Sequence, residues 1–289
     1  MASYSAPLRD MRFVYHELFD SSDISALPGF EEATPDLIDA VLEEAAKVCE
    51  NQLFPINRGG DEEGCRYHQG GEVTTPSGFR ECSRAYAEAG WIGLSSDPQY
   101  GGQGLPTAIS TLLEEMVCSS NIAFGTYVGL SRGAYRAIAA FGNDTLKTRY
   151  LPKLTSGEWS GTMCLTESQC GTDLGLLRTR AEPHADGSYR VTGNKIFISA
   201  GEHDLTDNII HLVLARTSDA PAGPKGLSLF IVPKYMVQDD GSLGDRNSIE
   251  CVSIEHKLGV RAGPTAVLEY EQATGFLVGD ENNGLAYMF

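Results

Sequence analysis

The sequence predicts an α+β protein, in which an N-terminal all-α helical domain precedes an antiparallel β-barrel or sandwich. Apolar residues recur at helical spacing up to about residue 158. From Trp159 onward, short runs rich in Val, Ile, Phe and Tyr alternate with turns, which is typical of antiparallel strands. At 289 residues the chain exceeds one average domain. We therefore predict a helical domain at 1–158, a β domain at 159–280 and the start of a third, helical domain at 281–289.

Apolar stripes and capping residues predict the helices of the first domain. The segment PLRDMRFVYHELFD at 7–20 carries one continuous apolar stripe. The next helix is expected to begin at Thr34 and Pro35, because threonine is a favoured cap and proline suits the first turn. Gly, Pro and Asn separate the remaining candidates, which are 77–90, 106–118, 121–141 and 144–154.

Alternating apolar runs predict the strands of the second domain. Turns such as ADG, DAPAG and QDDG separate the runs SYRVTG, KIFISA, NIIHLVLAR, GLSLFIVP, ECVSIEH and TAVLEYE. A helical pattern restarts at Gly284, and the sequence then ends on an apolar run without a cap or polar tail. We therefore expect the chain to be truncated, with more helix to follow.

The charge and the N-terminus bear on partners and location. A net charge of −17 disfavours nucleic acid and anionic membranes as partners, because both require a basic patch. No apolar run approaches the roughly 18 residues of a membrane span. The N-terminus lacks the apolar core of a secretory signal, and Glu17 and Asp20 argue against a transit peptide. We predict a cytoplasmic protein.

The cysteines and histidines do not form a recognisable metal site. Seven irregularly spaced cysteines indicate a reducing compartment rather than a disulfide framework, and no C-x-x-C pair is present. His203 and His211 lack the spacing of metal ligands, and the segment GEHD at 201–204 is predicted to be a polar loop. We expect no metal.

Several common catalytic motifs are absent. The sequence contains no G-x-x-x-x-G-K-[ST], no G-x-S-x-G and no H-E-x-x-H. The glycine cluster at 100–104 does not match G-x-G-x-x-G and lies between predicted helices. These absences disfavour ATPases, serine hydrolases, zincins and NAD enzymes.

Two segments have the chemistry of a cofactor site. In CLTESQCGTD at 164–173, backbone N–H groups around Gly171 and Thr172 can bind a phosphate oxygen, and the Thr166 hydroxyl faces a ligand from the strand end. In KIFISAG at 195–201, Phe197 and Ser199 fall on one side of a strand, which suits a flat heterocycle. These residue types also occur in ordinary cores and loops, so composition alone does not identify a flavin.

The two segments together resemble the paired FAD-binding segments of the acyl-CoA dehydrogenase family. The resemblance continues through AGWIGLSSDPQYGGQGLP, YLPKLTSGEWSGTM, KGLSLFIVP and HKLGVRAGPTAVLEYE, in the family's order. Segments such as DEEGCRYHQGGEVTTPSGF and ISAGEHDLTDNIIHLVLAR are most similar to the long subfamily that includes 3-methylmercaptopropionyl-CoA dehydrogenase.

The resemblance implies FAD as the cofactor and assigns its binding residues. They are Met163, Leu165, Thr166, Gly171, Thr172, Phe197 and Ser199. Met163, Leu165 and Thr166 are expected to line the isoalloxazine, with the Thr166 hydroxyl near flavin N5. Gly171 and Thr172 are expected at the pyrophosphate, and Thr172 also beside the CoA arm of the substrate. Phe197 and Ser199 are expected to pack on and hydrogen-bond the other flavin edge.

The resemblance also bears on Phe197 and on five further positions. Cys170 stands where Gly, Ala, Ser or Asn is usual, and Phe197 where Trp is frequent, which leaves substrate preference and redox tuning open. Glu167 and Asp173 are expected to serve hydrogen bonding within the turn rather than acid–base catalysis. Lys195 and Arg261 are expected to be structural.

The resemblance implies FAD-dependent α,β-dehydrogenation of an acyl-CoA thioester, with electrons passed to electron-transfer flavoprotein. The family's base is a glutamate in a C-terminal helical bundle; no position here corresponds to it, so we assign no catalytic residue. We expect this chain to bind FAD weakly and to be inactive alone, and the full-length form to be a homodimer or homotetramer.

Two alternatives remain. An acyl-CoA oxidase or a flavin monooxygenase would share the fold and use a different electron acceptor, which oxygen consumption would reveal. A natural short form that binds acyl-CoA or a partner without turnover would be revealed by the length of the open reading frame. The acyl chain is not predicted.

Overall fold

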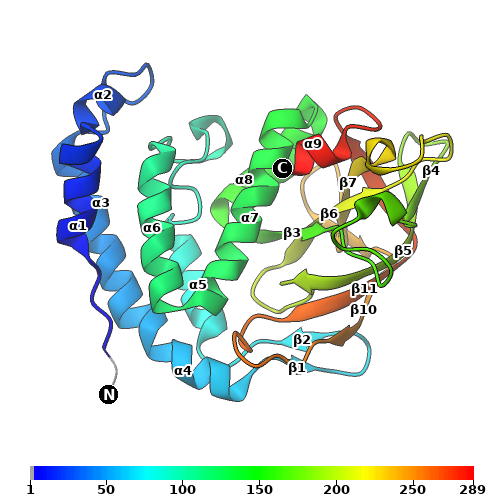
Figure 1. Ribbon diagram of the computed structural model, residues 1–289, viewed down its shortest axis with the longest axis horizontal. Coiled ribbons are helices and arrows are strands. Elements are labelled where there is room, and N and C mark those ends of the chain that lie inside the picture. Colours follow the sequence, from blue (N-terminus) through cyan, green and yellow to red (C-terminus); the bar gives the residue numbers. More distant parts are fainter. Residues whose placement is uncertain (1–2) are drawn as a thin grey trace.

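Helices dominate the chain up to residue 156 and strands dominate it from residue 159 (Figure 1). The computed structural model describes residues 3–289. Helices α7 and α8 lie between the remaining helices and the strands (Figure 1). The helical elements are α1 (Leu8–Arg12), a π-helix (Phe13–Leu18), α2 (Ser21–Ser25), α3 (Pro35–Val48), a second π-helix (Cys49–Leu53), α4 (Phe54–Glu63), α5 (Phe79–Glu88), a 3-10 helix (Pro98–Tyr100), α6 (Thr107–Ser120), α7 (Ile122–Phe141) and α8 (Asp144–Ser156).

Most predicted helices are confirmed, with two departures. Thr34 caps α3 by accepting a hydrogen bond from the Leu37 N–H at 3.4 Å. The segment predicted as one helix at 7–20 instead changes from α to π geometry at Phe13. Helix α4 was not predicted, because it contains two glycines; a Cβ at Gly60 would lie 2.5 Å from the Phe79 ring, so glycine allows close packing there.

Seven strands form the main sheet, in the order β3-β6-β7-β11-β5-β4 with β10 paired to β11. They are β3 (Trp159–Cys164), β4 (Arg180–Pro183), β5 (Tyr189–Ser199), β6 (Asn208–Ala215), β7 (Ser228–Pro233), β10 (Ile249–Ile254) and β11 (Thr265–Val278). Two small hairpins, β1 (Arg66–Tyr67) with β2 (Val73–Thr74) and β8 (Tyr235–Val237) with β9 (Leu243–Arg246), lie outside it. All pairs are antiparallel as predicted, except that β3 runs parallel to β6.

The sheet curls into a barrel-like shape because β11 pairs with β5 along most of its length and with β7 at its end. Opposite this bend, the Ala181 N–H donates to the Arg216 carbonyl at 2.8 Å, and the Arg216 N–H donates to the Thr179 carbonyl at 2.9 Å. These bonds join the start of β4 to the end of β6. Apolar side chains fill the interior of the curled sheet, where Phe230 and Val232 are fully buried.

Helix α7 packs directly on β3 and joins the helical part to the sheet. A Cβ at Gly161 would lie 2.3 Å from the Ala134 Cβ, so glycine is needed for this close approach. The helix predicted from Gly284 is α9 (Gly284–Met288), where Tyr287 stacks on Phe141 of α7 with ring centroids 4.3 Å apart. Across residues 3–289, no helix has both the length and the apolar character of a membrane span.

Candidate functional site

The two segments singled out in the sequence lie side by side. The chain leaves β3 at Cys164 and runs past the end of β5. The Ile196 N–H donates to the Thr166 carbonyl at 2.9 Å. The Lys195 Nζ donates to the Leu165 carbonyl at 2.9 Å, although these two residues are 30 positions apart. The structure therefore brings Thr166 next to the strand that carries Phe197 and Ser199.

A tight turn brings Gly171 and Thr172 back towards Thr166. The Glu167 N–H donates to the Cys170 carbonyl at 2.8 Å, and the Cys170 N–H returns a bond to the Glu167 carbonyl at 3.0 Å. A Cβ at Gly171 would be 3.4 Å from the Thr166 methyl group, so the turn folds over this threonine. Gly171 and Thr172 are both exposed.

The Glu167 carboxylate is buried and holds this turn together. It accepts hydrogen bonds from the backbone N–H groups of Arg178 and Thr179 at 2.7 and 2.9 Å, and from the Thr179 hydroxyl at 2.6 Å. It also accepts from the Gln169 amide at 2.5 Å and pairs with Lys195 at 2.9 Å. Burial raises the pKa of Glu167, but the Lys195 charge and these hydrogen bonds outweigh burial and lower the pKa to about 2.

The other charged residues predicted to be structural make contacts within the protein. Asp173 accepts a bond from the Gly175 N–H at 3.0 Å and thereby caps a 3-10 helix at Leu174–Leu176. Burial lowers the pKa of Lys195, and the attraction of Glu167 opposes that shift. Arg261 donates through its backbone N–H to the Asp61 carboxylate at 2.8 Å, far along the chain from both cofactor segments.

A β-bulge at the end of β5 turns Phe197 outward. Lys195 pairs with Leu268 and Ile198 with Ala266, so β5 has one more residue between these pairs than β11 has. In a regular strand Lys195 and Phe197 would share a face. Here the Lys195 side chain is fully buried and Phe197 is 57% exposed. Sequence reasoning missed the bulge, because no glycine or proline marks it.

Phe197 also has a strained backbone. Its φ of 59° lies in the left-handed region, which costs a residue with a Cβ about 1–2 kcal/mol. Strain of this kind, combined with an exposed aromatic ring, is typical of a ligand-contacting position.

The hydrophilic groups of the predicted site are free to bind a ligand. Thr166 and Ser199 are half-buried, as are Met163 and Leu165. Within residues 3–289 the hydroxyls of Thr166, Thr172 and Ser199 make no hydrogen bond to the protein. The same holds for the N–H groups of Gly171 and Thr172 among these residues.

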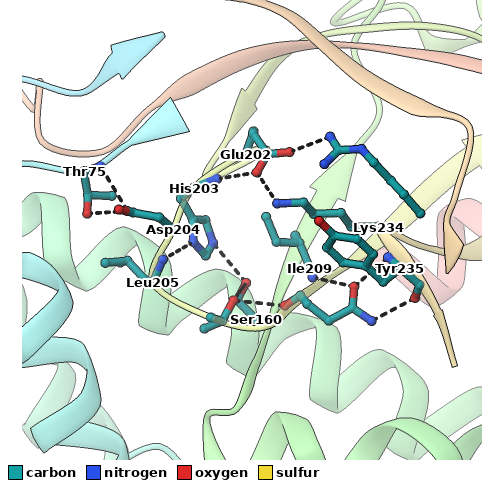
Figure 2. A network of polar contacts seen from close by, with 12 residues as sticks. Thr75, Ser160, Glu202, His203, Asp204, Leu205, Ile209, Lys234 and Tyr235 are labelled. Carbon is teal, nitrogen blue, oxygen red and sulfur yellow. Dashed lines mark hydrogen bonds and ion pairs between the residues drawn. The ribbon is translucent and has the colours of Figure 1, made fainter. Parts of the chain in front are cut away.

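A second polar network, shown in Figure 2, lies in the loop that follows Ser199. The polar loop predicted at 201–204 is confirmed, and its residues Glu202 and His203 are buried. The Leu205 N–H donates to His203 Nδ1 at 3.1 Å, so the ring proton resides on Nε2 and is donated to Ser160 Oγ at 3.0 Å. A catalytic base would have to accept the serine proton. This Ser–His pair is therefore not a nucleophile with its base.

The same network joins the loop to three parts of the structure (Figure 2). Asp204 accepts hydrogen bonds from the Thr75 N–H and hydroxyl at 3.0 and 2.7 Å. Glu202 pairs with Lys234 at the end of β7 and with Arg246 in β9. Burial and the Lys234 charge lower the pKa of His203 to about 3, so the ring is neutral. The network fixes the loop on which β5 ends.

A groove of about 730 Å³ lies elsewhere, between α5 and the loops at 156–158 and 204–207. Its lining mixes charges, including Arg80, Arg84, Glu158 and Asp207, and includes none of the seven predicted cofactor residues. Among residues 3–289, no group of three or more His, Cys, Asp or Glu side chains is placed to hold a metal ion.

The sequence profile of the acyl-CoA dehydrogenase N-terminal domain matches residues 36–158, and that of the middle domain matches residues 162–273. The chain belongs to the acyl-CoA dehydrogenase family. Members of this family use FAD. The resemblance and the fold predicted from the sequence are thus confirmed; the domain boundaries and the seven cofactor residues remain predictions.

Relatives in the acyl-CoA dehydrogenase family extend beyond this chain. The 3-methylmercaptopropionyl-CoA dehydrogenase of Ruegeria pomeroyi is 47% identical over 287 residues, which are 99% of this chain and 49% of that protein. The chain thus spans about half the length of the curated relatives it matches.

Two solved structures share the fold. Caenorhabditis elegans ACDH-11 in complex with C11-CoA has a TM-score of 0.77 at 20% identity, over 99% of this chain and 48% of that chain. An acyl-CoA dehydrogenase complexed with FAD from Bacillus anthracis has a TM-score of 0.70 at 23% identity, over 89% of this chain and 39% of that chain.

Proposed function

We propose that this chain supplies the flavin-holding part of an FAD-dependent acyl-CoA dehydrogenase, with FAD bound by the segments 163–173 and 197–199. The observation that carries the proposal is the exposed, strained Phe197 near the hydroxyls of Thr166 and Ser199, which have no protein partner within residues 3–289. Hydroxyls without partners at adjoining strand ends are suited to the polar edge of a heterocycle. An exposed aromatic ring is suited to its face.

The exposed turn at Gly171 and Thr172 suits the phosphate end of the cofactor. The chain carries a net charge of −17, so an anion is not attracted by the protein as a whole. Neighbouring backbone N–H groups without protein partners provide local donors instead. Because Gly171 has no side chain, a ligand can approach its backbone closely.

Bound at these segments, FAD would supply the hydride acceptor for dehydrogenation of the acyl thioester. The tasks of this chain are to orient the cofactor, exclude water from one of its faces and donate hydrogen bonds to its polar edge. Each such bond contributes about 1 kcal/mol, so these hydroxyls tune the cofactor rather than create its reactivity.

Neither carboxylate of the turn is suited to abstract the substrate proton. Glu167 already accepts five hydrogen bonds and has its pKa lowered to about 2. Asp173 caps a helix. We infer that the base is supplied by the part of the relatives' length that this chain does not span.

The substrate class and electron acceptor are also part of the proposal. We infer an acyl-CoA thioester as substrate, in keeping with the acyl-CoA dehydrogenase domains that match this chain, and electron-transfer flavoprotein as acceptor. An enzyme extended to the relatives' length is expected to reduce electron-transfer flavoprotein on addition of acyl-CoA. Rapid oxygen consumption without that acceptor would contradict the assignment.

The experiment that tests the cofactor site is a titration of the chain with FAD, followed by flavin fluorescence. Saturable binding is expected, with Thr166→Val and Ser199→Ala each weakening it about fivefold. Ser253→Ala is the matched control, since Ser253 is an exposed serine on β10, which β11 separates from β5. Absence of binding, or equal effects of Ser199→Ala and Ser253→Ala, would overturn the proposed site.

A further inference from the structure

We propose that Lys195 and Glu167 form a positioning pair that sets the relative placement of the two cofactor segments and balances the charge beside the flavin. This inference rests on the proposed function. It concerns two residues that do not themselves face the cofactor.

The pair supplies most of the direct polar links between the segments. The Lys195 ammonium donates to the Leu165 carbonyl and to the Glu167 carboxylate, both at 2.9 Å. Among residues 3–289, the remaining hydrogen bond between the segments is the backbone bond from Ile196 to Thr166. One buried side chain of β5 is therefore bonded to the residues on both sides of Thr166.

Lys195 also anchors the bulge that exposes Phe197. Because the Lys195 side chain points inward, the extra residue of the bulge must lie between Lys195 and Ile198. That placement turns Phe197 outward with its left-handed backbone. If Lys195 were released, the strand could shift towards regular alternation, which would move Phe197 and Ser199.

Stability alone does not account for this pair. The Lys195 side chain is 0% exposed and that of Glu167 is 5% exposed. Removing two charges from water at such a site costs several kcal/mol per ion, and an apolar pair of similar volume is often as stable. A task that needs charge and fixed geometry explains the pair better.

Lys195 is the residue to replace in a test, because Glu167 keeps its other hydrogen-bond partners when Lys195 is changed. Without Lys195, Glu167 still accepts bonds from Arg178, Thr179 and Gln169 and stays satisfied. Lys195→Met therefore removes the link to Leu165 and leaves one uncompensated negative charge beside the cofactor. Since the reduced flavin is the more electron-rich form, this charge disfavours reduction.

The structure offers a matched control in a second buried pair. Lys234 pairs with Glu202, with side chains 12% and 5% exposed. Lys234→Met leaves Glu202 paired with Arg246 and leaves the links of His203 and Asp204 in place, so the loop that follows β5 stays anchored. Lys234 makes no hydrogen bond to either cofactor segment within residues 3–289.

The test compares wild type, Lys195→Met and Lys234→Met by thermal unfolding, FAD titration and the midpoint potential of the bound flavin. Both variants are expected to lower the unfolding temperature. Only Lys195→Met is expected to weaken FAD binding about tenfold and to shift the potential to more negative values. If Lys195→Met does not fold, Lys195→Gln serves, because it keeps a donor for Leu165 while removing the charge; the same negative shift is expected.

The outcomes separate the two proposals. Wild-type affinity and potential in the folded Lys195 variant would overturn the positioning pair and leave the proposed function intact. Failure of the wild-type chain to bind FAD at any concentration tested would overturn the proposed function, and the inference with it.

Discussion

Replacing Glu167 with glutamine should change how the stability of this protein depends on pH. Its carboxylate has a pKa lowered from 4.5 to about 2 by Lys195 and by hydrogen bonds, against the effect of burial. A group whose pKa is depressed on folding contributes stability above its unfolded pKa, and the contribution disappears as pH falls through the folded pKa. The stabilising contribution of Glu167 is therefore lost as the pH falls from about 4.5 to about 2.

The magnitude follows from the size of the shift. At 1.36 kcal/mol per pKa unit, the contribution of Glu167 at pH 7 is about 3 kcal/mol. It remains about 3 kcal/mol at pH 5 and falls to about 1 kcal/mol at pH 3. Little of this is lost to solvent screening, because only 5% of the side chain is exposed.

The assay is urea unfolding of wild type and Glu167→Gln at pH 7, 5 and 3, followed by tryptophan fluorescence. Glutamine does not titrate, so the difference in free energy of unfolding should shrink from about 3 kcal/mol at pH 7 to about 1 kcal/mol at pH 3. Glu271→Gln is the control, because Glu271 is exposed and should change stability by less than about 0.5 kcal/mol at each pH. A Glu167→Gln difference of the same size at pH 7 and pH 3 would refute the reasoning.

Three further predictions concern the contacts of single residues. Phe197→Ala should weaken FAD binding about tenfold but reduce the free energy of unfolding by only about 1 kcal/mol, because Phe197 is 57% exposed. FAD titration and chemical denaturation measure the two effects, and a larger loss of stability than of affinity would contradict the role assigned to Phe197. Gly171→Ala should leave stability within about 0.5 kcal/mol of wild type, since the new Cβ meets the nearest atom at 3.4 Å, yet weaken FAD binding measurably; unchanged affinity would argue against close approach of the ligand. Gly161→Ala should destabilise by about 1–3 kcal/mol in urea unfolding, because its Cβ would lie 2.3 Å from the Ala134 Cβ. Its control is Gly133→Ala on the exposed face of α7, where the new Cβ meets open space and should stabilise by about 0.5–1 kcal/mol. Equal effects of the two substitutions would be inconsistent with the packing of α7 on β3.

Local sequence signals predicted the elements that local chemistry controls. The Thr34 cap and the following proline specify the start of α3. Asn143 similarly begins α8 by accepting from the Leu146 N–H at 2.9 Å. Where tertiary contacts determine the structure, the sequence gives no prediction or an incorrect one. Helix α4 forms in spite of its glycines because Gly60 packs against Phe79, and no local signal indicates that β3 runs parallel to β6.

The candidate site was predictable only in part for the same reason. The motif residues mark both segments, and the resemblance placed them together. Residue chemistry alone did not show that Lys195 turns inward while Phe197 turns outward, because that depends on register against β11. The polar residues of GEHD likewise gave no sign of burial, since Glu202 and His203 meet their partners in β3, in β9 and directly after β7 only on folding.

Hydrogen–deuterium exchange of the chain with and without saturating FAD tests most directly whether the two segments form the cofactor site. Slower exchange is expected in peptides that cover 163–173 and 195–201, with little change in α5 and the loop at 204–207 beside the large groove. Saturable FAD binding with protection at that groove, and none at the two segments, would contradict the account.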